Sequence, residues 1–344
     1  GKYAGLLVTP GAGSVDIHGG TIVVGNNNWL SIHNYSANRV TIGSLIGSTN
    51  PNVLKCGPGE LVLTNAANGF NTLGLYGGTL VVDALTNNGV VSAIGKAQLY
   101  LGNATLKYIG TGHATDRTIV LRGNGTIEAS GTGPLTFTTN RNFVVQAGGV
   151  ADMDLTLSGS GEGSIAGMMM LSAGCLVKAG SGTWTIGGVC SNYETSVNAG
   201  TLCLTGTLMS YNLASVNPGG TLSGGGTVLR ELAISGNVAP GTSVGALNVG
   251  CLTMQPGCVY EWEVDGGSAA ADTIAVAGSF ELPEAANSVT VKVVQVGGPV
   301  AGAYPLMTFA MMTGSTNALV VDAAGTGYSQ ASLNITDTGI TVGL

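Results

Sequence analysis

A short unit, usually opened by a threonine and continued by alternating apolar residues, recurs along most of this chain. Successive units begin about twenty residues apart between residues 21 and 222. Alternation of apolar and polar residues within a unit is typical of a short strand with one buried face. The units begin at Thr21, Thr41, Glu60, Thr79, Gln98, Thr118, Thr136, Leu155, Leu176, Thr201 and Thr221.

This fixed period predicts a parallel β-solenoid, in which each coil pairs its backbone with the coils before and after it. An antiparallel sandwich is the alternative, because it also has short strands, with turns every 8–12 residues or so. The longer and regular period favours the solenoid. Glycine accounts for 58 of the 344 residues, and it suits coil corners that need a positive φ or close stacking.

Two segments, residues 53–83 and 176–206, share a longer pattern. Each has Leu and Lys, then Gly-x-Gly, a strand, a polar loop with Asn and an aromatic residue, and Gly-Thr-Leu. The pattern resembles the autotransporter-associated β-strand repeat. The looser copy has Lys55 directly after Leu54, one position earlier than the pattern requires. The closer copy carries the motif residues Lys178, Gly180, Gly182, Thr183, Asn198, Gly200 and Thr201.

The resemblance implies a right-handed β-helix that is displayed on or released from a bacterium. The family has no defined catalytic residues, so it implies no catalytic, cofactor-binding or metal-binding residue here. We therefore expect an all-β chain with a right-handed parallel β-solenoid of about 20 residues per coil over residues 1–250, including an N-terminal cap. Longer strands after Cys251 predict a β-sandwich-like C-terminal cap over residues 251–344, which would cover the open edge of the last coil.

Charge and hydropathy argue against binding of nucleic acid and against insertion into a membrane. The net charge is −7 and only 8% of the residues are charged, whereas a nucleic-acid-binding domain needs clustered Lys and Arg. No apolar run reaches the eighteen or so residues of a membrane-spanning helix, so we expect no membrane insertion by this chain. Many Ser, Thr and Asn residues are common on extracellular proteins, and a start at Gly1 rather than Met is one that processing of a secreted protein would give. With the bacterial source that the resemblance implies, we expect a location at the cell surface or outside the cell.

Six cysteines match no zinc or haem spacing. An even number in a chain expected to be secreted favours disulfides. Cys251 and Cys258 flank a turn, Gln255-Pro256-Gly257, and are candidates for a disulfide across a hairpin. Cys190 and Cys203, about two-thirds of a coil apart, are a second candidate pair. Alternatively, several of these cysteines are small buried apolar side chains.

No cluster of residues identifies a reaction, and we expect no cofactor and no enzymatic activity. The histidines, His18, His33 and His113, lack Cys or carboxylate neighbours at metal-ligand spacing. Asp152 and Asp154 are candidates for an acid pair or a Ca²⁺ site on one strand face. A second group of charged residues predicts a solvated ion-pair surface: Asp116, Arg117, Arg122 and Glu128.

The first functional hypothesis is therefore an extracellular structural or adhesive rod. Its partners would be cell-surface glycans or proteins, or copies of itself joined head to tail into a fibre or layer. The candidate contact aromatics are Tyr3, Trp29, Tyr76 and Tyr100. The alternative is a carbohydrate-active β-helix enzyme or glycan-binding spike, which needs an acidic and basic groove along one sheet. A third hypothesis is an inactive scaffold for a functional domain elsewhere.

Overall fold

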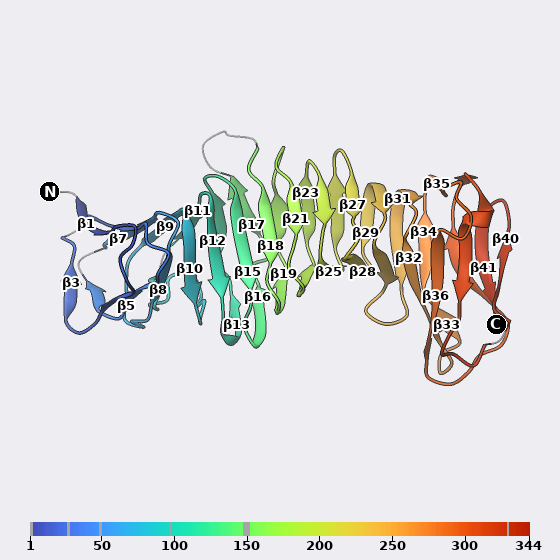
Figure 1. Ribbon diagram of the computed structural model, residues 1–344, viewed down its shortest axis with the longest axis horizontal. Helices are drawn as coiled ribbons and strands as arrows, with labels where there is room; N and C mark the ends of the chain where they lie inside the picture. The colour runs from blue at the N-terminus through green and yellow to red at the C-terminus, as the bar shows by residue number, and fades with distance from the viewer. Residues whose placement is uncertain (1–2, 26–27, 48–49, 97, 147–151, 329) are drawn as a thin grey trace. The chain divides into compact units, whose positions relative to one another are not determined.

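The computed structural model describes residues 3–25, 28–47, 50–96, 98–146, 152–328 and 330–344. Short strands follow one another from β1 (Tyr3–Val8) to β41 (Gly339–Gly343), and one 3₁₀ turn, η1 (Thr316–Ala318), interrupts them (Figure 1). No α-helix occurs in the described ranges, and accordingly none there is long and apolar enough to cross a membrane. The chain divides into two compact units, Gly1–Leu176 and Val177–Leu344. The all-β prediction is confirmed.

In the first unit, each coil contributes strands to separate parallel ladders. Trp29 lies opposite Asn52, and Asn52 opposite Thr72, so partners are about one coil apart in sequence. The first ladder runs through β1, β4 (Trp29–Asn34), β7 (Asn52–Cys56), β9 (Thr72–Tyr76), β11 (Gln98–Leu101), β14 (Ile119–Leu121), β17 (Asn142–Gln146) and β20 (Met168–Met170).

A second ladder covers another face of the same coils. It runs through β2 (Val15–Ile17), β5 (Val40–Ile42), β8 (Glu60–Leu63), β10 (Gly78–Val82), β12 (Ala104–Tyr108), β15 (Gly125–Ala129) and β18 (Leu155–Ser158). Shorter parallel ladders join β3 (Thr21–Val23) to β6 (Leu45–Gly47), and β13 (Thr111–Thr115) through β16 (Gly133–Phe137) to β19 (Glu162–Ile165). The parallel β-solenoid prediction is thus confirmed.

The second unit repeats this arrangement after β21 (Leu176–Lys178). One parallel ladder contains β22 (Thr183–Ile186), β25 (Gly200–Leu204), β28 (Gly220–Gly224), β30 (Asn237–Pro240), β32 (Val259–Asp265), β36 (Val289–Val296) and β39 (Leu319–Asp322). The other faces contain β23 (Val189–Asn192), β24 (Thr195–Val197), β26 (Thr207–Ser210), β27 (Ala214–Val216), β29 (Thr227–Ile234), β31 (Ala246–Met254), β34 (Thr273–Val276), β35 (Ser279–Glu281), β37 (Ala303–Thr308) and β38 (Met311–Thr313).

The interior of the coils is a column of apolar side chains at paired positions. Trp184 lies opposite Leu202, Leu202 opposite Leu222 and Leu222 opposite Val238, and each is at most 1% exposed. Full burial of such a side chain contributes about 1.5–3 kcal/mol. Since strand residues alternate between two faces, the neighbours of these core residues face outward and are free to form a binding surface.

Parallel coils continue beyond the boundary expected at residue 250, which lies inside β31. Antiparallel pairing is found where β41 joins β37 and β40 (Ser332–Ile335), and where β33 (Ala270–Ala271) joins β32. The last strands therefore depart from the coil pattern in part. The division at residue 250 and the capping role of residues 251–344 stay predictions.

Candidate functional site

The motif lysine of the closer repeat copy, Lys178, lies fully inside the coil. Its Nζ donates hydrogen bonds to the backbone oxygens of Ala179, Gly180 and Ala199, each at 2.8 Å. Ala199 belongs to the turn that begins the next coil, so the ammonium group connects one coil to the next. Burial lowers the pKa of Lys178 to about 8. This lysine is a structural clamp, and its buried charge is not offered to a ligand.

Lys55 makes the same clamp in the looser copy. Its Nζ donates to the backbone oxygens of Cys56, Gly57 and Gly77 at 3.2, 2.7 and 3.0 Å, and burial lowers its pKa to about 8 as well. The residue two positions before each lysine, Val53 or Leu176, is buried, whereas Leu54 is only half-buried. Val53, and not Leu54, therefore corresponds to Leu176. Lys55 then stands two positions after the buried residue, as Lys178 does, and the expected one-residue shift of Lys55 is wrong.

The motif glycines allow the corners of successive coils to stack. Gly180 and Gly200 have positive φ angles of 69° and 62°, which only glycine adopts readily. A Cβ atom on Gly200 would lie 2.5 Å from the carbonyl oxygens of both Gly180 and Gly182. Of the remaining motif residues, Thr183 lies opposite Thr201 in the ladder, and Asn198 Oδ1 accepts a hydrogen bond at 2.7 Å from Asn217 Nδ2.

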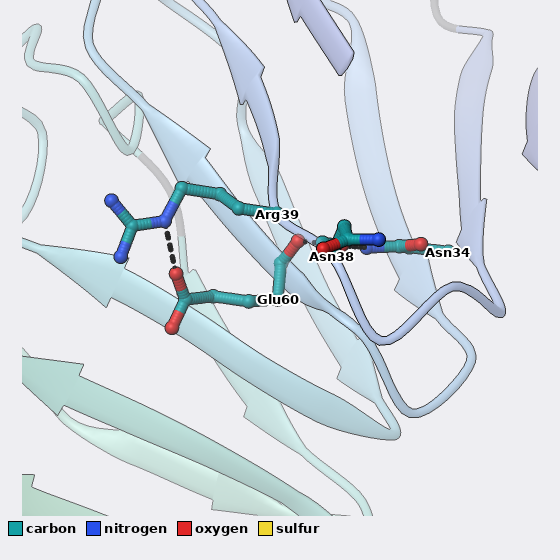
Figure 2. A network of polar contacts seen from close by, with 4 residues as sticks. All are labelled: Asn34, Asn38, Arg39 and Glu60. Carbon is teal, nitrogen blue, oxygen red and sulfur yellow. Dashed lines mark hydrogen bonds and ion pairs between the residues drawn. The ribbon is translucent and has the colours of Figure 1, made fainter. Parts of the chain in front are cut away.

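A buried asparagine closes another corner of the first unit. Asn34 Nδ2 donates to the backbone oxygens of Asn38 and Glu60 at 2.9 and 3.0 Å, and its Oδ1 accepts from the Ser36 amide at 3.0 Å. Figure 2 shows Asn34, Asn38 and Glu60 of this network, with Arg39 paired to the Glu60 carboxylate. Both polar atoms of the amide are used, in bonds within its own turn and in one bond to the next coil at Glu60, so this corner is structural.

The sequence candidates for metal binding and acid chemistry do not converge. His18 is exposed after β2, while His33 in β4 stacks on Tyr35 with ring centroids 6.3 Å apart; His113 lies in β13. Asp152 is exposed, and the Asp154 carboxylate accepts a hydrogen bond from the Cys175 amide at 2.8 Å. Across the described ranges, no three His, Cys, Asp or Glu residues are placed to hold a metal ion together.

The expected ion-pair surface around Arg117 is wrong. Arg117 is buried, and it donates to the backbone oxygens of Thr86 and Gly95 at 2.6 and 2.9 Å. Burial lowers its pKa to about 10 against the attraction of Asp116. Glu128 pairs instead with Lys107 at 2.8 Å. The four charged residues therefore serve separate roles.

The cysteine candidates carry thiols in this structure. Cys190 lies opposite Leu208, whereas Cys203 lies in another sheet between Thr185 and Ser223. Burial raises the pKa of Cys190 and Cys258 to about 12. The turn between Cys251 and Cys258 is present, since the Cys258 amide donates to Gln255 at 3.1 Å. It joins β31 to β32, which lie in different sheets, so the expected hairpin is wrong. The disulfides themselves stay predictions.

The outer face of the first ladder carries an aromatic pocket, defined by Trp29, Thr72, Gly74, Tyr76, Tyr100 and Arg122, with a volume of about 240 Å³. The aromatic residues come from β4, β9 and β11 of the first ladder, in which β7 lies between β4 and β9, and β9 pairs directly with β11. Their strand neighbours, including Leu30, Leu73 and Leu99, are buried. The alternation of each strand thus directs the pocket residues outward.

Two glycines hold the Tyr76 ring in place. A Cβ atom on Gly74 would lie 2.8 Å from Tyr76 Cε2, and one on Gly102 would lie 2.9 Å from Tyr76 Cδ1. The ring therefore occupies the space left by two missing side chains, while Tyr76 remains 42% exposed. The Arg122 guanidinium carbon lies 5.4 Å from the centroid of the Tyr100 ring, a cation–π distance. The pocket is preorganised by these contacts.

The sequence named three of the pocket's aromatic residues, Trp29, Tyr76 and Tyr100, and the structure brings them together. Tyr3 is the fourth aromatic candidate from the sequence. Its backbone pairs with Trp29, but its side chain lies outside the described residues. Sequence reasoning missed Thr72 and the two glycines, and it assigned Arg122 to an ion-pair surface instead. A glycine at an outward strand position, such as Gly74 opposite Tyr100, is the signal that points to a hollow on the coil surface.

Another cavity of about 490 Å³ in the first unit is polar. It is lined by Asn88, Asp116, Thr118, Thr138, Thr139, Asn140 and Arg141. The Asp116 carboxylate already accepts a hydrogen bond at 2.7 Å from the Asn88 amide. An apolar groove of about 370 Å³ in the second unit includes Leu229, Gly250 and Ala277. Neither of these two cavities combines aromatic faces with a charged group.

Comparison with known proteins gives one similarity that bears on function. Over 187 residues, 50% of this chain, the sequence is 31% identical to a protein named Adhesin BmaC autotransporter from Brucella suis biovar 1 (strain 1330). The matched region is 5% of that protein's length, so the chain spans only a small part of this relative. No protein-family model matches the chain. The chain is thus similar to part of an adhesin autotransporter, and its membership of the autotransporter-associated repeat family stays a prediction.

Proposed function

We propose that this chain is an adhesive β-solenoid of a bacterial surface or secreted protein, and that it contacts its target through the aromatic pocket. The observation that carries the proposal is the set of outward-facing rings of Trp29, Tyr76 and Tyr100 in one hollow. The similarity to a named adhesin autotransporter supports the adhesive role and the surface or extracellular location.

The physical case rests on rigidity and exposed apolar area. Parallel pairing with neighbouring coils fixes each strand that carries a pocket residue, and a contact surface that is already ordered loses little entropy on binding. Tyr and Trp are the side chains that most often anchor interfaces. On a chain with only 8% charged residues, binding by such anchors needs no strong electrostatic attraction.

The alternative of a carbohydrate-active enzyme has less support. A glycosidase needs two carboxyl groups facing one substrate, but the Asp154 carboxylate already accepts a hydrogen bond from the Cys175 amide. Asp272, whose pKa burial raises to about 7, accepts hydrogen bonds from the Gly245 and Glu263 amides and is fully buried. A substrate on the surface does not reach it. The absence of enzymatic activity stays a prediction.

Assembly of copies into a fibre is a separate proposal within the same function. Unpaired strand edges at the end of a solenoid are templates for further pairing, and a head-to-tail contact that does not close produces a filament. Negative-stain electron microscopy of the purified chain at several concentrations, with and without reductant, tests it. Regular filaments are the expected result, and separate particles under every condition would exclude assembly.

Adhesion is tested with beads coated with the purified chain and added to cultured epithelial cells. We expect saturable attachment that the soluble chain inhibits. A matched preparation of albumin-coated beads gives the background. Attachment no greater than that background, on several cell types and on extracellular matrix, would contradict the adhesive function.

A further inference from the structure

We infer that the aromatic pocket takes one neutral pyranose unit of a glycan. The inference rests on the proposed adhesive function and names the chemical class of its target. It follows from three properties of the pocket: its size, the arrangement of its aromatic faces, and the small number of charged groups around it.

The size of the pocket suits a single sugar unit. Its volume of about 240 Å³ lies below the range of about 300–1,000 Å³ that holds drug-sized molecules. Gly74 keeps the floor low, because any side chain at that position would meet Tyr76 and Leu54. The pocket is open on the outer face of the coils, so the remainder of a glycan can continue into solvent.

The aromatic faces match the apolar side of a pyranose ring. Several C–H groups of such a ring point to one face, and they carry a small positive charge. The faces of Trp and Tyr rings are negative, so the two surfaces attract each other while both lose contact with water. Trp29 and Tyr100 extend from strands on either side of β7 and β9, which places aromatic surface at two sides of the hollow.

Polar groups at the rim match the hydroxyl groups of the sugar. The Thr72 hydroxyl donates and accepts hydrogen bonds, and the Arg122 guanidinium presents a fork of donors. The cation–π contact with Tyr100 limits the positions of that guanidinium. Hydrogen bonds at the rim would orient the sugar, whereas the aromatic rings would supply most of the contact area.

The charges favour a neutral ligand. The pocket contains one cation and no carboxylate, and the cation already contacts an aromatic face. A carboxylate or a phosphate is bound most strongly where a guanidinium makes two parallel hydrogen bonds to it, and the single guanidinium here is already held against the Tyr100 ring. The net charge of −7 on the chain adds repulsion toward acidic glycans.

The test uses the full chain on an array of neutral and acidic glycans, followed by titration of a neutral glycan that binds. Tryptophan fluorescence reports the pocket selectively, because Trp184 and Trp262 are fully buried and Trp29 is not. We expect a neutral glycan to change this fluorescence saturably. Tyr76→Ala and Tyr100→Ala should each weaken binding about 10-fold, and Thr72→Val, which keeps the shape of the pocket, about 3-fold.

Tyr211→Ala is the matched control. Tyr211 belongs to the second unit, does not line the pocket, and makes the same 5.4 Å contact with an arginine, Arg230, as Tyr100 makes with Arg122. Circular dichroism and thermal unfolding verify that each variant folds. Tyr211→Ala should bind the glycan like the unchanged chain.

Absence of neutral-glycan binding at millimolar concentration would overturn the inference. Binding to acidic glycans alone, or binding unaffected by Tyr76→Ala and Tyr100→Ala, would also overturn it. If coated beads still attach to cells while no neutral glycan binds, the saccharide inference fails and the adhesive function stands. If neutral glycans bind in the pocket while the beads do not attach, the inference stands and the adhesive function fails.

Discussion

Replacing Lys178 with Met removes the ammonium group that joins two coils while keeping a side chain of similar length. Burial alone lowers the pKa of Lys178 from 10.5 to about 8, which corresponds to about 3 kcal/mol against the charged form. Each hydrogen bond from a charged group contributes about 1.5–3 kcal/mol, and the three bonds to Ala179, Gly180 and Ala199 outweigh that cost. Lys178→Met should therefore destabilise the second unit by about 3 kcal/mol.

Hydrogen exchange measures this loss where it occurs. The Asn198 amide donates to Lys178 O at 2.9 Å, so its protection reports on the pairing of these two coils. A loss of about 3 kcal/mol corresponds to exchange faster by about 100-fold. Local measurement is preferable to a single unfolding midpoint, because solenoid coils need not unfold together.

Lys292→Met is the control substitution. Lys292 is half-exposed and pairs with Glu261 at 3.0 Å on the surface of the same unit, and such pairs contribute about 0–1 kcal/mol. Equal protection of Asn198 in the two variants would refute the clamp and leave Lys178 as a tolerated buried charge.

Three further substitutions test other parts of the structure. Gly200→Ala should lower the free energy of unfolding by about 2 kcal/mol or more, because a Cβ atom there meets two carbonyl oxygens at a positive φ. The control is Gly298→Ala, which has open space around it and should change the urea midpoint little. Arg117→Met should destabilise the first unit by about 2–4 kcal/mol in urea unfolding, since the Thr86 and Gly95 carbonyl groups lose a buried donor. Asp272 has a pKa of about 7 in the folded chain, against an ordinary value of 3.8. Between these pH values the folded chain binds more protons than the unfolded chain, so the free energy of unfolding should fall as pH rises from 4 to 7. Urea midpoints at pH 5 and 8 should differ in this direction, and Asp272→Asn should reduce the difference; a midpoint that rises with pH and is unchanged by Asp272→Asn would contradict it.

The solenoid could be predicted because its cause is local. Alternation within Thr201-Leu202-Cys203-Leu204 determines which side chains face inward, and the glycine that precedes it determines the corner. These patterns recur at a fixed spacing, so the coil follows from them. The turn after Cys251 was also predictable from Pro and Gly. The strands on either side of this turn, β31 and β32, lie in different sheets. The turn is therefore a corner of a coil, whereas a hairpin would place two antiparallel strands in one sheet.

The candidate site depends on register between coils, which sequence spacing does not determine. Trp29 and Thr72 are two coils apart, whereas Thr72 and Tyr100 lie on successive coils, so no single sequence spacing links the three residues. Only the ladder pairing shows that their strands lie on the same face of nearby coils. Arg117 and Lys178 were difficult for a different reason. Charged residues are usually exposed, and the burial of these two depends in part on backbone carbonyl groups of other coils, Gly95 for Arg117 and Ala199 for Lys178.

Attachment of beads coated with Tyr100→Ala, compared with beads coated with Tyr211→Ala, tests the central claim most directly. Both tyrosines contact an arginine at 5.4 Å, but only Tyr100 lines the aromatic pocket. The proposed function predicts that Tyr100→Ala beads lose most of their attachment to cultured cells, whereas Tyr211→Ala beads attach like the unchanged chain. Equal attachment of the two, with both variants folded, would show that adhesion does not pass through the aromatic pocket.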